Sequence, residues 1–220
     1  MKNIKAIIFD AYGTLFDVNS AAEKCKSKIG DKWESFANYW RKTQLEYTWL
    51  RSLMGRHKDF WQITEDSLDK SMQAFNIDKA MKNELLDLYR ILSPYPEVKE
   101  TLEKLKHKKY KLAILSNGTP SLLNELVKSN DLQNLFDDIF SIEEVKIYKP
   151  SSKVYDMPVK KYNIEKEDAA FLSANTWDVS GGGNYGFSSI WVNRNNNIFD
   201  NLDYIPKNEI SGLNQLLDIL

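Results

Sequence analysis

The sequence predicts an α/β protein with a doubly wound, Rossmann-like parallel sheet and an all-helical cap subdomain inserted into it. Two observations predict the core: residues 4–9 form an apolar run, interrupted only by Lys5, that enters a turn, and strand-like and helix-like segments alternate after Pro96. The third observation is that residues 16–98 have helical periodicity without any strand signal. We therefore expect a core domain of residues 1–15 and 99–220 and a helical cap of residues 16–98.

The elements expected in the first half follow the apolar pattern. Residues 4–9 predict a strand, because strands buried on both faces of a parallel sheet are almost continuously apolar. A long helical stretch is predicted next, because large apolar residues recur at spacings of three, four and seven: Phe36, Tyr39, Trp40, Tyr47, Leu50 and Met54. A second helical stretch ends before Pro94. The linkers to the core are therefore expected near Asp17 and residues 94–96.

The second half alternates between short apolar segments and amphipathic ones. Strands are predicted at residues 111–115, 138–141, 169–173 and 188–192. Amphipathic helices are predicted at residues 97–106, 121–128, 151–162 and 210–220. This alternation indicates βαβ units with right-handed crossovers, so we expect a parallel sheet covered by helices on both faces.

The composition excludes several classes of partner. The 220 residues carry 30 Lys and Arg against 31 Asp and Glu, a formal charge of −1, so no strong field attracts nucleic acid or an anionic membrane. The single cysteine, Cys25, excludes intrachain disulfides and multi-thiolate metal sites. No apolar segment has the length of a signal peptide or a membrane span, so we expect a cytoplasmic protein with neither nucleic-acid nor membrane partners.

Polar side chains follow four of the predicted strands. Each of them alone is typical of a turn or a helix N-cap. Ligands of open α/β sheets, however, bind outside the carboxyl ends of the strands, where these side chains come together. The residues, in strand order, are Asp10 and Thr14, Ser116 and Asn117, Lys149, and finally Ser173, Asn175 and Asp178.

This set of side chains favours chemistry on an anion. Lys149 supplies positive charge, although a solvated surface lysine is the alternative, and the Ser116 hydroxyl supplies a donor. The Asp10 carboxylate, kept ionised by a nearby lysine, can attack an electrophilic centre. The two histidines, His57 and His107, are placed to serve neither as a catalytic base nor as zinc ligands. An aspartate is therefore the predicted nucleophile.

Four motifs occur at these strand ends: Asp10-Ala-Tyr-Gly-Thr14-Leu-Phe, Ser116-Asn117-Gly118, Tyr148-Lys149-Pro150 and Ser173-Ala-Asn175-Thr-Trp177-Asp178. The chain resembles the haloacid dehalogenase superfamily in these motifs, and within it the L-2-haloacid dehalogenases. The resemblance covers most of the chain, including Tyr39-Trp40-Arg41 and Gln44-Leu-Glu-Tyr-Thr-Trp-Leu50 in the insertion. It implies an (S)-2-haloacid dehalogenase that acts on short 2-haloalkanoic acids without a cofactor or a metal, and it favours a homodimer.

The resemblance also implies roles for individual residues. Asp10 attacks C2 opposite the halogen, which releases halide, inverts C2 and leaves an ester that water hydrolyses at the Asp10 carboxyl carbon. Arg41 on the cap meets the halide or the substrate carboxylate, and Thr14 holds the Asp10 carboxylate. The polar network around the nucleophile is implied to be Lys149, Tyr155, Ser173, Asn175 and Asp178, with Asp178 as the best candidate to orient the water.

The same resemblance implies the surroundings of the substrate. Ser116 and Asn117 bind its carboxylate, and the apolar wall and remaining contacts come from Ala11, Tyr12, Leu45, Phe60, Tyr155 and Trp177. Without the resemblance, ordinary packing is the preferred interpretation of Leu45, Phe60 and Trp177. Leu45 follows Arg41 by one helical turn, so both can face the core.

Two alternatives remain open. The Asp-x-x-Gly-Thr turn is shared with magnesium-dependent phosphatases, so phosphate release from a small metabolite is the first. Such phosphatases usually carry a second aspartate as general acid two residues after the nucleophile, where this chain has Tyr12. A halide leaving group needs no proton, so Tyr12 favours the dehalogenase. The second alternative is a non-catalytic binding module that uses the aromatic insertion as a docking surface.

Overall fold

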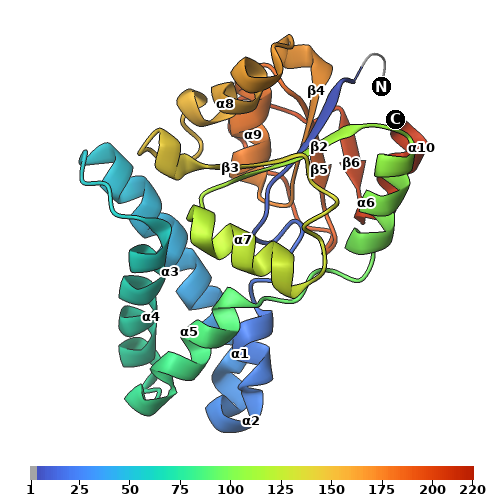
Figure 1. Cartoon of the computed structure of the whole chain (residues 1–220). Coiled ribbons are helices and arrows are strands. Elements are labelled where there is room, and N and C mark those ends of the chain that lie inside the picture. The colour runs from blue at the N-terminus through green and yellow to red at the C-terminus, as the bar shows by residue number, and fades with distance from the viewer. Residues whose placement is uncertain (1–3) are drawn as a thin grey trace.

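Within residues 4–220, which the computed structural model describes, six parallel strands form one sheet in the order β3-β2-β1-β4-β5-β6 (Figure 1). Residues 1–3 of the predicted core domain lie outside this range. The strand order reverses between β1 and β4, because the chain runs outward through β2 and β3 and returns on the other side of β1. The strands are β1 (Ala6–Phe9), β2 (Lys111–Ser116), β3 (Asp138–Ser141), β4 (Ala169–Ser173), β5 (Ser188–Val192) and β6 (Asn208–Ile210).

Helices cover both faces of the sheet. All residues of β1 and β4 are buried, so both faces of these strands must be shielded from water. One face carries α8 (Ser152–Tyr162) and α9 (Thr176–Tyr185), while the other carries α6 (Val98–His107), α7 (Pro120–Ser129) and α10 (Leu216–Ile219) (Figure 1). None of the helices within residues 4–220 is long and apolar enough to cross a membrane.

Five further helices form a group to one side of the sheet, here called the cap (Figure 1). They are α1 (Ser20–Lys24), α2 (Lys26–Ile29), α3 (Trp33–Leu53), α4 (Phe60–Phe75) and α5 (Lys82–Arg90). The two longest, α3 and α4, pack along each other, and the Phe36 ring meets Phe75 edge-on at 5.9 Å. The N-terminus of α4 is capped by the Asp59 carboxylate, which accepts a hydrogen bond from the Gln62 N–H at 2.9 Å. This N-terminal capping hydrogen bond fixes the point where the chain turns back after α3.

The two linkers between cap and sheet run side by side. Phe16 pairs with Pro94 in an isolated antiparallel bridge. Backbone hydrogen bonds of 2.8 and 3.0 Å on either side of this bridge join the same two segments. We call residues 15–17 and 93–95 the neck. The chain therefore leaves and re-enters the core at one place.

The predicted fold class is confirmed, but the helix predicted at residues 210–220 is wrong at its start. Ile210 ends the edge strand β6, and helical turns begin only with η5 (Leu213–Gln215) and α10. Because β6 has three residues and one buried side chain, it is too short to produce a recognisable strand pattern. The first strand also begins at Ala6 rather than at residue 4.

Candidate active site

The carboxyl ends of β1, β2 and β4 meet where the strand order reverses. The last residue of β1 lies opposite Ile114 of β2 and Leu172 of β4. Asp10 therefore emerges between the ends of these two strands, which finish with Ser116 and Ser173. This is the position at which open α/β sheets bind ligands.

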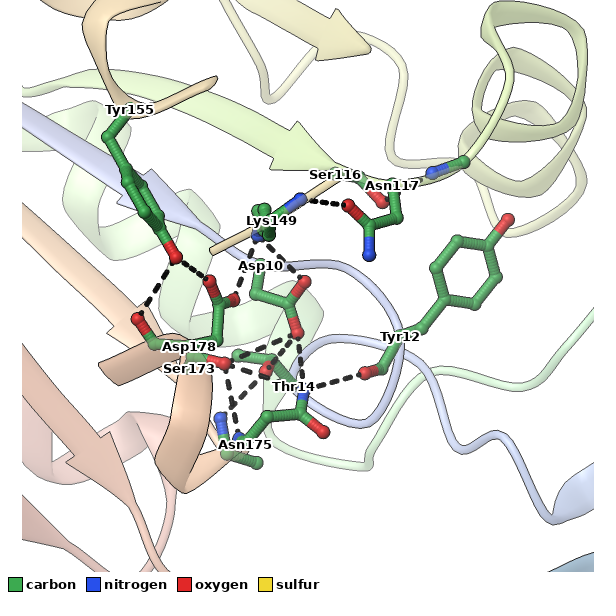
Figure 2. A network of polar contacts seen from close by, with 12 residues as sticks. Asp10, Tyr12, Thr14, Ser116, Asn117, Lys149, Tyr155, Ser173, Asn175 and Asp178 are labelled. Atoms are coloured by element: carbon green, nitrogen blue, oxygen red, sulfur yellow. Dashed lines mark hydrogen bonds and ion pairs between the residues drawn. The ribbon is translucent and has the colours of Figure 1, made fainter. Parts of the chain in front are cut away.

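Four side chains hold the Asp10 carboxylate (Figure 2). Its Oδ2 accepts hydrogen bonds from the Thr14 hydroxyl at 2.9 Å, from Asn175 Nδ2 at 3.0 Å and from the Ser173 hydroxyl at 3.4 Å. Its Oδ1 accepts one hydrogen bond, from Lys149 Nζ at 3.1 Å. Only 5% of Asp10 is exposed. The carboxylate thus has a fixed orientation, with Oδ1 carrying fewer donors than Oδ2.

The turn after β1 positions Thr14. Gly13 has a φ of +89°, in the left-handed region that favours glycine, and this reverses the chain so that Thr14 reaches back to Asp10. The Thr14 hydroxyl also accepts a hydrogen bond from the Ala174 N–H at 2.8 Å, which links it to the end of β4. Ala11 is buried and closes the same turn through its carbonyl oxygen. The backbone around Asp10 is therefore held from two strands.

Lys149 lies between two carboxylates. Its Nζ donates to Asp10 Oδ1 at 3.1 Å and to Asp178 Oδ2 at 2.9 Å, while the Tyr155 hydroxyl donates to Asp178 Oδ1 at 2.7 Å. Burial acts to lower the pKa of Lys149, but the Asp10 and Asp178 carboxylates raise it, and the net result is a raised pKa and a protonated ammonium. Burial raises the pKa of Asp178 to about 6, against the opposing effect of Lys149.

The Lys149 ammonium is the cation that compensates the two carboxylates at this site. Magnesium requires several oxygen ligands in near-octahedral geometry. Here the carboxylates of Asp10 and Asp178 both accept hydrogen bonds from the same ammonium. In the part of the chain that the structure describes, no group of three or more His, Cys, Asp or Glu side chains is arranged to hold a metal ion. These residues therefore do not fit a bound divalent cation.

Ser116 and Asn117 shape the turn after β2. The Ser116 hydroxyl is fully buried and accepts a hydrogen bond from the N–H two residues later at 3.1 Å. Asn117 Oδ1 accepts a hydrogen bond from the Lys149 backbone N–H at 3.1 Å, which fixes the orientation of the amide. The Asn117 amide nitrogen consequently points into the space between Asp10 and the Tyr12 ring (Figure 2). Asn117 can donate to a ligand there, and the Ser116 hydroxyl orders the turn as an acceptor while keeping its own proton to donate.

Aromatic rings line the side of this space that faces the cap. The Tyr12 ring stacks on Tyr89 with centroids 5.7 Å apart, and the Phe60 ring lies 5.1 Å from Tyr12. Tyr148 adds a ring 6.4 Å from Phe60. Burial raises the pKa of Tyr12 well above its usual value, so its hydroxyl stays neutral. The wall is therefore apolar and uncharged.

Helix α3 carries Arg41 to the turn after β1. Arg41 Nη2 donates to the Tyr12 carbonyl oxygen at 3.3 Å, which joins the cap to the core. Leu45, one turn later, and Trp177, at the start of α9, are both half-buried. The Trp177 ring meets Trp49 of α3 edge-on at 5.4 Å. Since residues four apart share a helix face, Trp177 lies against the face that also carries Leu45 and Arg41.

Three residues at this site receive no role from the sequence pattern, although Gln44 and Tyr148 occur in motifs that carry the resemblance. Gln44 accepts a hydrogen bond from Arg41 Nη1 at 2.8 Å, and its spacing of three residues from Arg41 is a signal that the sequence does offer. Tyr89 comes from α5 and Tyr148 from the loop before Lys149. No periodicity distinguishes these two tyrosines from other buried aromatics, so only the folded chain reveals them.

Comparisons with known proteins identify the family. A family model described as haloacid dehalogenase-like hydrolase matches residues 4–186. The chain is a haloacid dehalogenase-like hydrolase. Among the curated relatives of this hydrolase, the (S)-2-haloacid dehalogenase of Pseudomonas fluorescens is 38% identical over 218 residues, which cover 98% of this chain and 96% of the relative.

Solved structures agree with this family. A dehalogenase crystal structure superposes on the hydrolase with a TM-score of 0.98 at 35% identity, covering 100% of this chain and 98% of the other. The L-2-haloacid dehalogenase from Xanthobacter autotrophicus, with chloropropionic acid covalently bound, gives a TM-score of 0.91 at 31% identity and 98% coverage of both chains. The hydrolase therefore belongs with the (S)-2-haloacid dehalogenases.

Proposed function

We propose that this protein releases halide from short 2-haloalkanoic acids, with Asp10 as the nucleophile. The observation that carries the proposal is the fixed Asp10 carboxylate, which faces a space between Asn117 and the Tyr12 ring (Figure 2). The Phe60 ring lies against Tyr12 on the side of the cap. The curated relatives are named for activity on (S)-2-haloacids, and the Xanthobacter enzyme holds chloropropionic acid covalently. Both findings support the same class of substrate here.

In the first step, Asp10 attacks C2 of the haloacid. Oδ1 is the attacking oxygen in this proposal, because Oδ2 is engaged by Thr14, Ser173 and Asn175, whereas Oδ1 contacts only Lys149. A bond forms between Oδ1 and C2 while the carbon–halogen bond breaks, and the halide leaves with the bonding electron pair. Attack opposite the halogen inverts the configuration at C2.

In the second step, water attacks the carboxyl carbon of the Asp10 ester. Asp178 is the proposed general base, because a carboxyl with a pKa of about 6 is ionised at neutral pH and still accepts a proton readily. The donors Thr14 and Asn175 stabilise the negative charge that develops on Oδ2. The bond from the carboxyl carbon to Oδ1 then breaks, and the departing oxygen takes up the proton that Asp178 received from water. The 2-hydroxy acid therefore keeps Oδ1, and Asp10 gains an oxygen from water.

Arg41 and Asn117 are the proposed anion-binding groups. The Arg41 guanidinium carries a permanent charge and presents several N–H donors, so it suits either the substrate carboxylate or the departing halide. Asn117 supplies a neutral donor on the same turn that holds Lys149. The apolar wall around them, to which we assign Leu45 and Trp177, keeps water away and strengthens these interactions.

A magnesium-dependent phosphatase is the rival function, and two features weigh against it. Tyr12 stands where such enzymes have a second carboxylate, and burial keeps its hydroxyl protonated and weakly acidic. The Lys149 ammonium already compensates the Asp10 and Asp178 carboxylates, which are the oxygen ligands that a metal would need. Halide release from 2-chloropropionate in the presence of a chelator is therefore expected, and phosphate release that requires magnesium would overturn the proposal.

A single-turnover reaction in water labelled with oxygen-18 tests the covalent mechanism. With enzyme in excess, the product should contain an unlabelled oxygen from Asp10, and mass spectrometry of the peptide that contains Asp10 should find the label there. Label that enters the product directly in one turnover would show that water attacks C2 without an ester. Asp10→Asn serves as the inactive control.

We also propose that the protein is a homodimer joined through the cap. At the end of α3, Leu50, Leu53 and Met54 are 44%, 85% and 64% exposed, which is unusual for three neighbouring large apolar side chains. Analytical ultracentrifugation over a range of concentrations tests this, with Leu53→Glu expected to favour the monomer. A wild-type protein that sediments as a monomer at every concentration contradicts the proposal.

A further inference from the structure

Gln44 is a buried amide that contacts the guanidinium of Arg41. It lies on α3, and only 1% of it is exposed. Its Oε1 accepts a hydrogen bond from Arg41 Nη1 at 2.8 Å. The other guanidinium nitrogen, Nη2, donates to the Tyr12 carbonyl oxygen at 3.3 Å. Arg41 is thus held from the cap on one side and from the core on the other.

The orientation of the Gln44 amide is fixed by two other cap helices. Its Nε2 donates to the Thr64 hydroxyl oxygen of α4 at 2.8 Å and to the Tyr89 hydroxyl of α5 at 3.0 Å. The Thr64 hydroxyl donates its own proton to the Phe60 carbonyl at 2.7 Å, so it must act as the acceptor towards Gln44. Both N–H groups of the amide are then used, and Oε1 has to face Arg41.

The groups that hold Arg41 are neutral. Gln44 Oε1 and the Tyr12 carbonyl carry no formal charge, and burial raises the pKa of Tyr89, which keeps that neighbouring hydroxyl protonated. Three other arginines of the chain each pair with a carboxylate, at distances from 2.7 to 3.2 Å: Arg51 with Asp66, Arg90 with Glu125 and Arg194 with Glu97. In residues 4–220, Arg41 has no such carboxylate partner and is held by neutral acceptors instead.

We propose that Gln44 is a positioning residue that holds Arg41 over the site while leaving its charge uncompensated. A carboxylate at this position would hold the guanidinium equally well but would neutralise it, and an apolar side chain would leave it without an anchor. The Gln44 amide anchors the guanidinium without neutralising its charge, so Arg41 stays available to bind an anion. This inference rests on the proposed function, in which Arg41 meets the substrate carboxylate or the halide.

Gln44→Glu separates the effect of charge from the effect of shape. The variant should lower kcat/KM for 2-chloropropionate by roughly tenfold or more near neutral pH, because its carboxylate competes with the substrate for Arg41. A glutamate beside a guanidinium stays ionised above its ordinary pKa of about 4.3, so this loss of activity relative to wild type should persist from about pH 9 to about pH 5. Gln73→Glu, on the exposed face of α4, adds the same charge elsewhere and should behave as wild type at every pH.

Gln44→Met keeps the volume of the side chain without any charge and covers the case in which Gln44→Glu fails to fold. A folded Gln44→Met protein should show a raised KM. Because Gln44 acts through Arg41, the same substitution should cause no further increase in KM when it is added to an Arg41→Lys variant. Wild-type kinetics in folded Gln44→Glu or Gln44→Met, or losses that add to that of Arg41→Lys, overturn the inference. Absence of halide release by wild type would instead reject the proposed function.

Discussion

The Lys149 ammonium and the Asp178 carboxylate form a completely buried ion pair, with 2.9 Å between Nζ and Oδ2. The same ammonium also contacts Asp10, at 3.1 Å from Oδ1. One cation therefore compensates two carboxylates in a site that is almost closed to water. Lys149 keeps a partner if either aspartate is removed, whereas both aspartates lose their counter-ion if Lys149 is removed.

Lys149→Met should damage both stability and activity. The free energy of unfolding should fall by about 3–5 kcal/mol, because the variant leaves buried carboxylates uncompensated. Halide release should fall by more than about a hundredfold, since the charge that organises Asp10 and Asp178 is lost. Urea denaturation and a halide assay measure the two effects. Adding Asp178→Asn should restore part of the stability and none of the activity; a double variant no more stable than Lys149→Met would contradict this explanation.

The activity should fall as the pH decreases through about 6, because Asp178 has its pKa raised to that value by burial and must be ionised to accept a proton from water. The measurement is a profile of kcat against pH, with buffer ions chosen to avoid halide. Asp178→Asn should remove this acidic limb together with most of the activity. A wild-type profile that is flat between about pH 5 and about pH 8 would show that Asp178 is not the titrating group.

The same raised pKa affects folding stability. A carboxyl whose pKa is higher in the folded state than in the unfolded state stabilises the fold below the unfolded pKa of about 3.9. For Asp178, this contribution is lost as the pH rises through about 6. The free energy of unfolding of wild type should therefore fall relative to that of Asp178→Asn as the pH rises across this window, which urea denaturation at several pH values can measure.

Tyr155→Phe should shift the acidic limb of the activity profile to higher pH. The Tyr155 hydroxyl donates to Asp178 Oδ1 at 2.7 Å and thereby lowers the pKa of that carboxyl, so its removal should raise this pKa further. Tyr185→Phe is the matched control, because the Tyr185 ring packs on Tyr155 while its hydroxyl donates to Asp156 instead. A limb that moves equally in both variants would point to repacking of the rings rather than to the hydrogen bond.

Gly181→Ala should lower activity through Asp178 although it alters no polar group. A Cβ at Gly181 would overlap the Tyr155 hydroxyl and would lie 2.6 Å from Pro150 Cβ. Tyr155 must then move away from Asp178. Asn184→Ala, on the exposed side of the same helix, is the control and should keep wild-type activity. Equal kcat values for Gly181→Ala and wild type would show that the packing around Tyr155 can adapt without any loss of activity.

The convergence of the core residues could be predicted from the sequence because parallel strands deliver their ends to one edge. Asp10, Ser116 and Ser173 follow buried apolar runs, and the sheet places these ends side by side. The bridging position of Lys149 between Asp10 and Asp178 is less accessible to such reasoning. It depends on how the loop after β3 folds over the site, and the pattern of apolar residues carries no information about that loop.

The contribution of the cap was harder to predict, because it depends on how helices dock. Helical periodicity indicates that Gln44 and Arg41 share a face of α3, but the partners of that amide, Thr64 and Tyr89, come from two other helices. Ser116 shows a different difficulty, since its position at a strand end predicts a ligand contact but does not show that its hydroxyl also accepts the hydrogen bond that orders the following turn. Local patterns identify which residues are near the site more readily than what each one contacts.

Because the two linkers of the neck are paired, the segment between them can be exchanged without altering the path of the core. Because Phe16 and Pro94 lie side by side, a segment inserted between them begins and ends at the same point of the core and does not interrupt the sheet. The core alone contains Asp10, Lys149 and Asp178, while the inserted segment supplies Arg41 and Phe60. If Asp10 acts as proposed, exchanging that segment for another helical one would present the same carboxylate with different surroundings, so substrate choice could diverge while the reaction chemistry is retained.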